Sequence, residues 1–386
     1  MPRRTGGFIG HRGLQAPDPP TIGTASAGNA RVSVAFTAPS DVGDDAITGF
    51  VAQVGTAGVT GSSSPIVVSG VSNGSEVTAQ VRAINDYGTS APSADSSGVT
   101  PSSSGTGVAA GGLSGYATHI DHIVIASLGN ALEFGDLSVG RANGPAAAGN
   151  ASRVLFAGGY GPSDNSDVID FGTYAGGTFT DFGNLTNARN GTAGCNNNTR
   201  AVFAMGSTAD QNVIDYVTIA SEGNTTDFGD LTVGRENGRG LASTTRGVFI
   251  GGNSNVIDYV TIGSTGNATD FGDLLSAATT AGGACSNATR GLHAGGRRSS
   301  SQIDVIQYIT IDSAGNATDF GDLASATRYM DGAASSSRAV FMGAQSANTI
   351  QYVTIASTGN ATDFGDMSNN LSTSNAATSN SHGGLS

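Results

Sequence analysis

The sequence predicts an all-β protein. Apolar runs are short and are separated by Ser, Thr, Asn and by glycine, which accounts for 59 of the 386 residues. The ten-residue segment STGNATDFGD occurs twice, at 264–273 and at 357–366, and four looser copies stand elsewhere in the chain. Short strands with frequent turn residues are typical of sandwiches and of repetitive β architectures.

Charge and hydropathy exclude several classes of protein. The formal net charge is −13, which argues against broad binding to nucleic acid or to anionic membranes, since both reward clustered positive charge. No apolar run forms a signal-peptide core or reaches the roughly 20 residues of a membrane helix. We therefore expect a soluble product without nucleic acid, without membrane insertion and outside the conventional secretory route.

The first part of the chain divides into a tail, a compact region and a linker. Residues 1–18 are rich in Gly and Pro and lack periodicity, which predicts an extended tail that carries Arg3, Arg4 and Arg12. Residues 19–101 contain β runs such as RVSVAFTAP and EVTAQVRAIN at intervals of roughly 8 to 12 residues, the spacing of a β-sandwich. A linker is expected at 102–106, where SSSGT interrupts this pattern.

Residues 19–101 resemble a fibronectin type III domain in the stretches VSVAFTAPSDVGDDAITGFVAQ and VSGVSNGSEVTAQVRAINDYGTSAPS. The resemblance implies a sandwich that serves as a spacer or docking module. Two positions depart from the family pattern, because Phe36 stands where a core Trp is usual and Val77 where a corner Tyr is usual. Both replacements are apolar, so we expect the core to persist without the hydrogen bond of the corner hydroxyl.

Residues 107–386 consist of a repeat. Its FGD or FGN core places Phe at 134, 182, 228, 271, 320 and 364, so that successive copies are 43 to 49 residues apart. A period in the forties matches a four-stranded propeller blade and is too long for one rung of a β-helix. In the third copy the four strands are expected at 191–196, 200–206, 212–220 and 225–231.

The two ends of the repeat region complement each other. The first copy begins partway through a unit and lacks its first strand, whereas the C-terminal SNAATSNSHGGLS aligns with CSNATRGLHAGG of an inner copy and supplies one. We therefore predict a six-bladed propeller closed by one C-terminal and three N-terminal strands.

The layout of the copies resembles kelch repeats. Shared features are the paired glycines after an apolar strand, the Tyr of IDYVTI and an Arg near the start of the unit, although the last strand has Phe where kelch repeats usually have Trp. The tandems close to DYVTIASTGNATDFGDL also resemble those of virion structural proteins of marine tailed phages, including cyanophages. This resemblance implies a non-enzymatic protein on the particle surface.

Variation among the copies indicates where a ligand would bind. The loop between the second and third strands changes from GGNSN (251–255) to GGYGPSDNSD (158–167) and GGRRSSSQID (295–304), and the connection between copies also varies. In a propeller both sets lie on one face, where variable loops on a rigid scaffold commonly form a binding surface. The candidate ligand-binding residues are Tyr160, Arg297, Arg298, Arg328 and Tyr329.

A competing explanation applies to the arginines that recur. The alignment of the copies assigns Arg141, Arg189, Arg235 and Arg328 to one repeat position, and recurrence favours hydrogen bonding between neighbouring blades over ligand binding. Tyr160 and Arg297 do not recur, so they carry the binding hypothesis better.

Catalysis has little support in the sequence. The two His of HIDH (119–122) point to opposite faces of a strand, which is a poor metal pair. The Asp residues of TDFGD repeat in most copies, whereas an active site is normally single. Cys195 and Cys285 occupy matching repeat positions and are expected to be buried apolar side chains. We expect no enzyme activity, no cofactor and no metal.

Together these features predict a tail fibre or adhesin of a phage, located on the virion, whose propeller face binds a host surface glycan or protein. Arg3, Arg4 and Arg12 of the tail, with the sandwich, are expected to dock onto other virion proteins. A capsid decoration or head-fibre protein is the first alternative, and an intracellular kelch-type interaction scaffold is the second. A homotrimer is left open, since fibres are often trimers.

Overall fold

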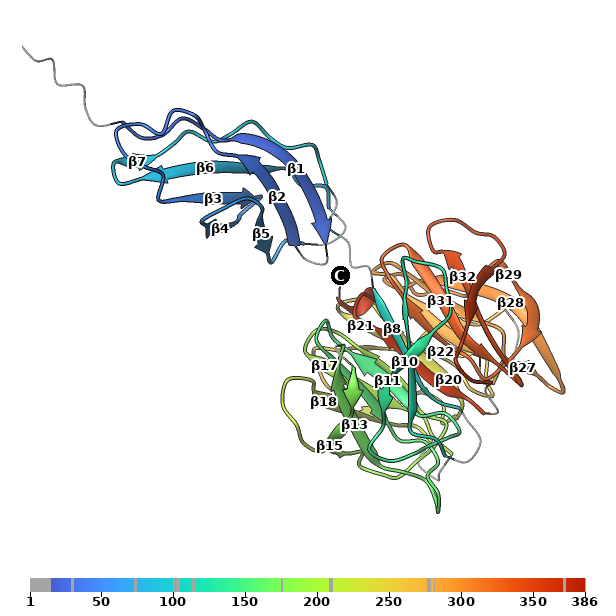
Figure 1. Ribbon diagram of the computed structural model, residues 1–386. Helices are drawn as coiled ribbons and strands as arrows, with labels where there is room; N and C mark the ends of the chain where they lie inside the picture. The colour runs from blue at the N-terminus through green and yellow to red at the C-terminus, as the bar shows by residue number, and fades with distance from the viewer. Residues whose placement is uncertain are drawn as a thin grey trace, which may run out of the picture. The chain divides into compact units, whose positions relative to one another are not determined.

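The computed structural model describes residues 15–28, 31–72, 75–99, 101, 105–112, 116–174, 176–207, 211–275, 279–280, 282–370 and 373–385. Arg3, Arg4, Arg12 and most of the expected linker lie outside these residues. The described chain is all-β, as predicted, and its strands form several antiparallel sheets (Figure 1). It divides into two compact units, Met1–Ser103 and Ser104–Ser386.

The first unit contains two antiparallel sheets. One has the order β1-β2-β5 and the other the order β4-β3-β6-β7. The strands are β1 (Thr21–Gly28), β2 (Arg31–Thr37), β3 (Gly49–Val54), β4 (Ala57–Gly61), β5 (Ile66–Ser69), β6 (Ala79–Asn85) and β7 (Gly88–Thr89). Every second residue of β2, β3 and β6 is buried, which is the period expected when one face of each sheet packs on a core.

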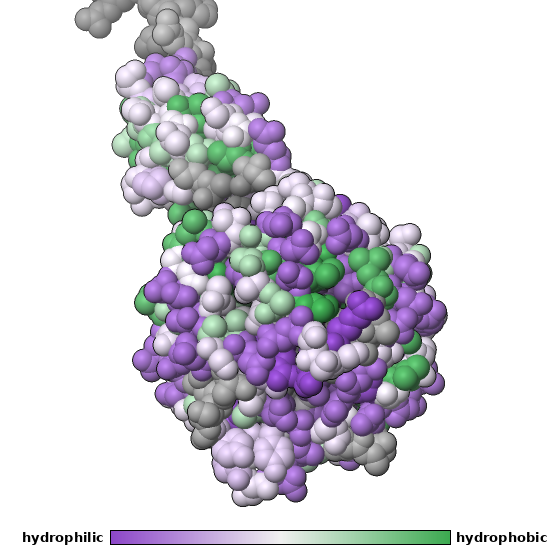
Figure 2. All heavy atoms as spheres, turned by 90° about the vertical axis from the view of Figure 1, so that its right-hand side faces the viewer, coloured by the Kyte–Doolittle hydropathy of each residue, from purple (hydrophilic) through white to green (hydrophobic). Residues whose placement is uncertain are grey.

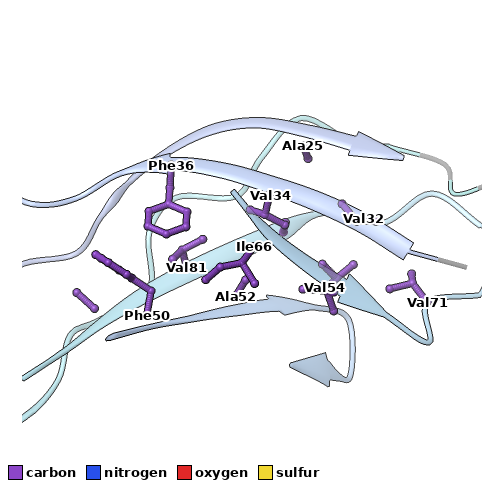
Figure 3. Packing of buried hydrophobic residues seen from close by; sticks show 13 residues of the cluster. Ala25, Val32, Val34, Phe36, Phe50, Ala52, Val54, Ile66, Val71 and Val81 are labelled. Carbon is purple, nitrogen blue, oxygen red and sulfur yellow. The ribbon is translucent and has the colours of Figure 1, made fainter. Parts of the chain in front are cut away.

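The two sheets share one hydrophobic core (Figure 3). Its aromatic centre is the pair Phe36 and Phe50, whose ring centroids are 4.7 Å apart. Val77 is half-buried against this core, and its N–H donates to the carbonyl of Val99 at 2.9 Å. Apolar side chains therefore fill both positions at which the fibronectin pattern has larger aromatic residues.

The second unit contains six sheets that follow one another along the chain, and we number them 1 to 6. Sheets 2 to 4 each have four antiparallel strands in sequence order. Sheet 2 has β11 (Ala146–Gly149), β12 (Arg153–Ala157), β13 (Val168–Thr173) and β15 (Thr180–Asn184). Sheet 3 has β16 (Ala193–Asn196), β17 (Arg200–Ala204), β18 (Val213–Thr218) and β19 (Thr226–Asp230). Sheet 4 has β20 (Gly238–Ala242), β21 (Arg246–Gly251), β22 (Val256–Thr261) and β23 (Thr269–Asp273).

Sheets 5 and 6 contain strands longer than those of sheets 2 to 4. Sheet 5 has β25 (Gly283–Ser286), β26 (Arg290–Ala294), β28 (Ser301–Thr310) and β29 (Thr318–Thr327), extended by β24 (Thr279–Thr280) and β27 (Arg297–Arg298). Sheet 6 has β30 (Asp331–Ala334), β31 (Arg338–Ala344), β32 (Ala347–Thr354) and β33 (Thr362–Asp366).

Sheet 1 joins the two ends of the second unit. It has β34 (Asn375–Ser379), β8 (Thr106–Gly111), β9 (His119–Val124) and β10 (Leu132–Asp136), and the short β14 (Gly177–Thr178) pairs parallel with β10. The strand β34 pairs antiparallel with β8, so that Ala377 lies opposite Ala109. The prediction that a C-terminal strand completes the first copy is confirmed by this pairing.

The first strands of the six sheets contact one another in a closed cycle. The order of contacts is β11, β16, β20, β25, β30, β34 and again β11. Buried side chains bond some of these neighbours directly. Asn196 on β16, for example, accepts from the N–H of Gly149 at 3.0 Å and donates to its carbonyl at 2.7 Å.

The repeated motif STGNATDFGD joins neighbouring sheets at five junctions, while sheets 1 and 2 are joined by the pairing of β14 with β10. In sheet 4 the Gly266 N–H donates to the carbonyl of Phe228 in sheet 3 at 2.8 Å, and the Asn267 Oδ1 accepts from the N–H of Asp230 at 3.1 Å. Equivalent bonds start from Gly223, Gly315, Gly359 and Gly129. The bond of Gly129 is made to Phe364 at 2.9 Å and thus links sheet 6 to sheet 1.

The glycine of each FGD core permits this close approach. Gly229 has a φ of +146°, and a Cβ there would lie 2.5 Å from the carbonyl oxygen of Gly266 in the next sheet. A side chain would therefore be strained by its backbone and would also displace the neighbouring turn.

A second set of bonds between sheets comes from the arginine that opens the second strand of a sheet. Arg246 stacks on Tyr259 of its own sheet, with its Cζ 4.2 Å from the ring centroid, and donates to the carbonyl of Ile311 in the next sheet at 2.7 Å. The same arrangement holds for Arg153, Arg200, Arg290 and Arg338. Arg338 donates to Ile125, so this contact also joins sheet 6 to sheet 1.

Candidate functional site

The loops that vary among the copies lie together in the structure. Tyr160, in the loop between β12 and β13, exchanges two backbone hydrogen bonds of 2.8 Å with Ala142, in the connection between sheets 1 and 2. In sheet 5 the Gly296 N–H donates to the carbonyl of Thr327, the last residue of β29 before the connection to sheet 6, at 2.8 Å. We call the surface formed by these loops and connections the variable face.

The space enclosed by the six first strands is too small for a ligand. It is a cavity of about 30 Å³ lined mainly by small residues from β11, β16, β20, β25, β30 and β34, and a volume of that size holds about one water molecule. Cys195 and Cys285 are among the lining residues, and both also belong to hydrophobic clusters of the second unit. Burial raises the pKa of the Cys195 thiol to about 12 and that of Cys285 still further, so both remain protonated at neutral pH.

The C-terminal residues cover one end of this cavity. Ser381 donates to the carbonyl of Ala334 at 3.0 Å, and the Nε2 of His382 bonds the carbonyl of Gly149 at 2.9 Å. Burial lowers the pKa of His382 to about 4, which keeps its ring neutral between the inner strands.

An ion pair spans the inner strands near their other ends. Arg239 on β20 places its Nε 3.2 Å from Asp331 on β30 and donates from Nη2 to the carbonyl of Met330 at 2.8 Å. Burial raises the pKa of Asp331, while Arg239 and three backbone N–H groups oppose that rise. Burial and the same arginine lower the pKa of His293 to about 4. These groups connect strands and leave no open site between them.

Three of the four arginines thought to recur form buried ion pairs. Arg189 donates from Nη2 to Asp215 at 2.8 Å, and both side chains are fully buried. The corresponding pairs are Arg141 with Asp170 and Arg235 with Asp258. Each arginine precedes the first strand of a sheet, and its Asp lies on the third strand of that sheet. The ion pairs lie within one sheet, but the backbone of Arg189 also bonds Gly159 and Ser166 of the preceding sheet. Arg189 therefore makes the expected bonds between sheets through its backbone.

Arg328 does not occupy the recurring position. Arg189 and Arg235 come four residues after the Leu that ends the preceding motif, but Arg328 comes five residues after Leu323. Thr327 takes the place of the arginine, since its carbonyl accepts from Gly296 as the carbonyl of Arg189 accepts from Gly159. The prediction that Arg328 recurs is wrong because Thr327 stands at the recurring position and Arg328 is the residue after it.

The aspartate of the ion pair is replaced in the sheets that lack the recurring arginine. Sheets 5 and 6 have Gln307 and Gln351 at the position that holds Asp in sheets 2 to 4. The Oε1 of Gln351 accepts from the N–H of Ala324 at 2.7 Å. An amide can be buried without a counter-ion, whereas an unpaired carboxylate cannot. The repeat thus exchanges an ion pair for a neutral side chain.

Four of the five candidate residues gather on sheets 5 and 6. Arg297 and Arg298 form β27, and Arg328 and Tyr329 follow β29. The Cζ of Arg328 lies 4.3 Å from the centroid of the Tyr329 ring. Its Nε donates to the Oε1 of Gln345 at 2.9 Å, and the Nε2 of Gln302 donates to the same oxygen at 2.7 Å.

Tyr160 belongs to a different part of the variable face. Its ring centroid is 6.1 Å from that of Tyr116, which lies between β8 and β9 of sheet 1. The structure therefore divides the candidates into a tyrosine pair, Tyr116 and Tyr160, and a second group on sheets 5 and 6. Tyr116, Gln302 and Gln345 were missed from the sequence. The longer hairpins around Gln302 and Gln345 were the available signal.

The described residues contain no group of three or more His, Cys, Asp or Glu side chains that could hold a metal ion. No helix in the described ranges is long and apolar enough to cross a membrane. Hydrophilic residues predominate on the face in Figure 2, where the apolar areas are small and separate.

No protein-family model matches this sequence, and no curated protein matches it.

Proposed function

We propose that the second unit is a six-bladed kelch-like β-propeller and that the first is a fibronectin type III-like sandwich. The closed cycle of contacts among first strands supports the propeller, as do the identical bonds between sheets. Three separate bonds link sheet 6 to sheet 1, namely those of Gly129, Asn130 and Arg338. Two sheets around one core support the sandwich.

The function we propose is that of a non-enzymatic virion protein, a tail fibre or adhesin, whose variable face binds a host surface glycan or protein. The observation that carries the proposal is the group formed by Arg297, Arg298, Arg328 and Tyr329. These residues depart from the repeat at one place, where a longer hairpin meets a connection in which Thr327 replaces the recurring arginine. A binding site requires such a departure, because six equivalent loops would otherwise look alike.

The position on the particle follows from the same proposal. The tail with Arg3, Arg4 and Arg12 would dock to other virion proteins, and the acidic propeller would project from the surface. We base the phage assignment on the amino-acid sequence of the repeat, since no curated protein matches the chain.

Two measurements test the function. Immunogold labelling with an antibody to residues 105–385 should mark the tails of virions, whereas label on heads would favour a capsid decoration protein and no label would refute the proposal. The purified chain should bind host cells, and Tyr329→Ala should weaken that binding. The matched control is Tyr87→Ala, which removes a tyrosine of the first unit that is 44% exposed. Equal loss in both variants would contradict a site on the variable face.

A further inference from the structure

The arginines of the second unit can be accounted for one by one. Residues 105–385 contain 12 of them. Four form the buried ion pairs, Arg141, Arg189, Arg235 and Arg239. Five stack on an aromatic ring and bond the next sheet, Arg153, Arg200, Arg246, Arg290 and Arg338. The three that remain are Arg297, Arg298 and Arg328, and none of them forms an ion pair within the described ranges.

Two of these three lie in one row across neighbouring strands. Arg297 is directly opposite Gln302 in the pairing of β27 with β28, so both side chains lie on the same face of the hairpin. Arg328 follows Thr327, which pairs with Ile303, and this places it beside Gln302 on the other side. Three adjacent strands span about 10 Å. Arg298 is opposite Ser301 and points to the other face.

The guanidinium of Arg328 is held in place by groups that leave part of it free. Tyr329 lies under its plane and Gln345 accepts its Nε–H, whereas its Nη1 and Nη2 make no hydrogen bond with any described residue. Two parallel N–H groups on a fixed guanidinium match the two oxygens of a carboxylate or sulfate. The nearest acid along β28 is Asp304, which pairs with none of the three arginines.

We propose that Arg297, Gln302 and Arg328 bind an oxyanion carried by a sugar ring, either a carboxylate or a sulfate ester, with Gln302 and Gln345 bonding adjacent hydroxyls. This inference rests on the proposed function and narrows its ligand to an anionic glycan. In a chain of net charge −13, two arginines without acidic partners on one row create a local attraction for anions against a repulsive background. The Nη1 and Nη2 groups of Arg328, which make no hydrogen bond with any described residue, would orient the bound anion.

The test uses the full chain and three probes: oligogalacturonate, which carries carboxylates, a sulfated dextran oligosaccharide and neutral dextran. Calorimetric titration should detect one of the two anionic probes and not the neutral one. Arg297→Ala and Arg328→Ala should each weaken this binding about 10- to 100-fold, the range for a lost charge-assisted pair. Arg328→Lys should also lose most affinity, because lysine keeps the charge without the fork.

Arg298→Ala is the matched control, since it removes the same charge from the opposite face of the same hairpin and should change affinity less than about 3-fold. Equal weakening by Arg298→Ala, full affinity in Arg328→Lys, or binding of neither anionic probe would each overturn the inference. If Arg297→Ala and Arg328→Ala still bind host cells like the wild type, the anion site is wrong while the adhesin function stands. If the wild type binds the anionic probe but no host cell, the adhesin function is wrong instead.

Discussion

Sheet 3 can be given the neutral residues that stand in sheets 5 and 6 in place of the paired Arg and Asp. Arg189→Thr leaves the carboxylate of Asp215 buried, with only the two bonds of Thr186 at 2.8 and 2.9 Å. Both partners are fully buried, and removal of one member of such a pair costs about 3–5 kcal/mol. A domain of this size loses about 2–4 °C of melting temperature per kcal/mol, so the midpoint should fall by roughly 6–20 °C.

The double variant Arg189→Thr/Asp215→Gln reproduces the residues that sheet 6 has at Thr327 and Gln351. Because no charge is then buried without a partner, it should lose only about 1 kcal/mol, the value of an ordinary hydrogen bond. Thermal and urea unfolding of the wild type, both single variants and the double variant form a complete cycle. A double variant that melts no higher than Arg189→Thr would refute the reasoning, as would a single variant that melts like the wild type.

Three further predictions concern the bonds between sheets and the buried histidines. Deletion of residues 370–386 removes β34 and the cover of the central cavity, and calorimetry should show a sharply lower melting temperature; an unchanged melt would contradict closure of sheet 1 by this strand. Gly229→Ala should lower the melting temperature by several degrees, whereas Gly263→Ala, where a Cβ would meet nothing within 4 Å, should not. The pKa values of His293 and His382 are both lowered to about 4, so the unfolded chain binds more protons than the native one below about pH 6.5. Stability should therefore fall as pH drops from about 6.5 to about 4, and His382→Gln should make that fall shallower in urea titrations at each pH.

Much of the fold was predictable because the chain repeats itself. Each copy of the repeat encodes the same structural unit, so an alignment of the copies separates the turns that recur from those that vary. In the third copy the strands were expected at 191–196, 200–206, 212–220 and 225–231, and they lie at Ala193–Asn196, Arg200–Ala204, Val213–Thr218 and Thr226–Asp230. The apolar runs and the turn glycines contain this information locally, and only the ends differ by a few residues.

The buried ion pairs were not predictable in the same way. Arg189 and Asp215 are 26 residues apart, and nothing local indicates that one side chain reaches the other across two strands. The change to Gln351 could have served as a signal, because it coincides with the loss of the arginine. The displacement of Arg328 was visible as a spacing of five residues from Leu323 where other copies have four, yet its consequence depends on backbone bonds that only the structure contains.

The near-identity of STGNATDFGD among copies has a physical cause in its two complementary halves. The turn Gly266–Asn267 bonds the backbone of the preceding copy, while the FGD of the same motif accepts the turn of the following copy. A change in either half would have to be matched in a neighbour, so the motif resists variation. Loops whose bonds stay within one sheet have no such constraint. The extended hairpin of Arg297 and the replacement of the recurring arginine by Thr327, with Arg328 after it, are two departures from the repeat, and Gln302 and Gln345 bring them together. Independent drift in two separate loops would not be expected to leave two unpaired arginines in one row, which is why we assign function to this place and not to the repeated motif.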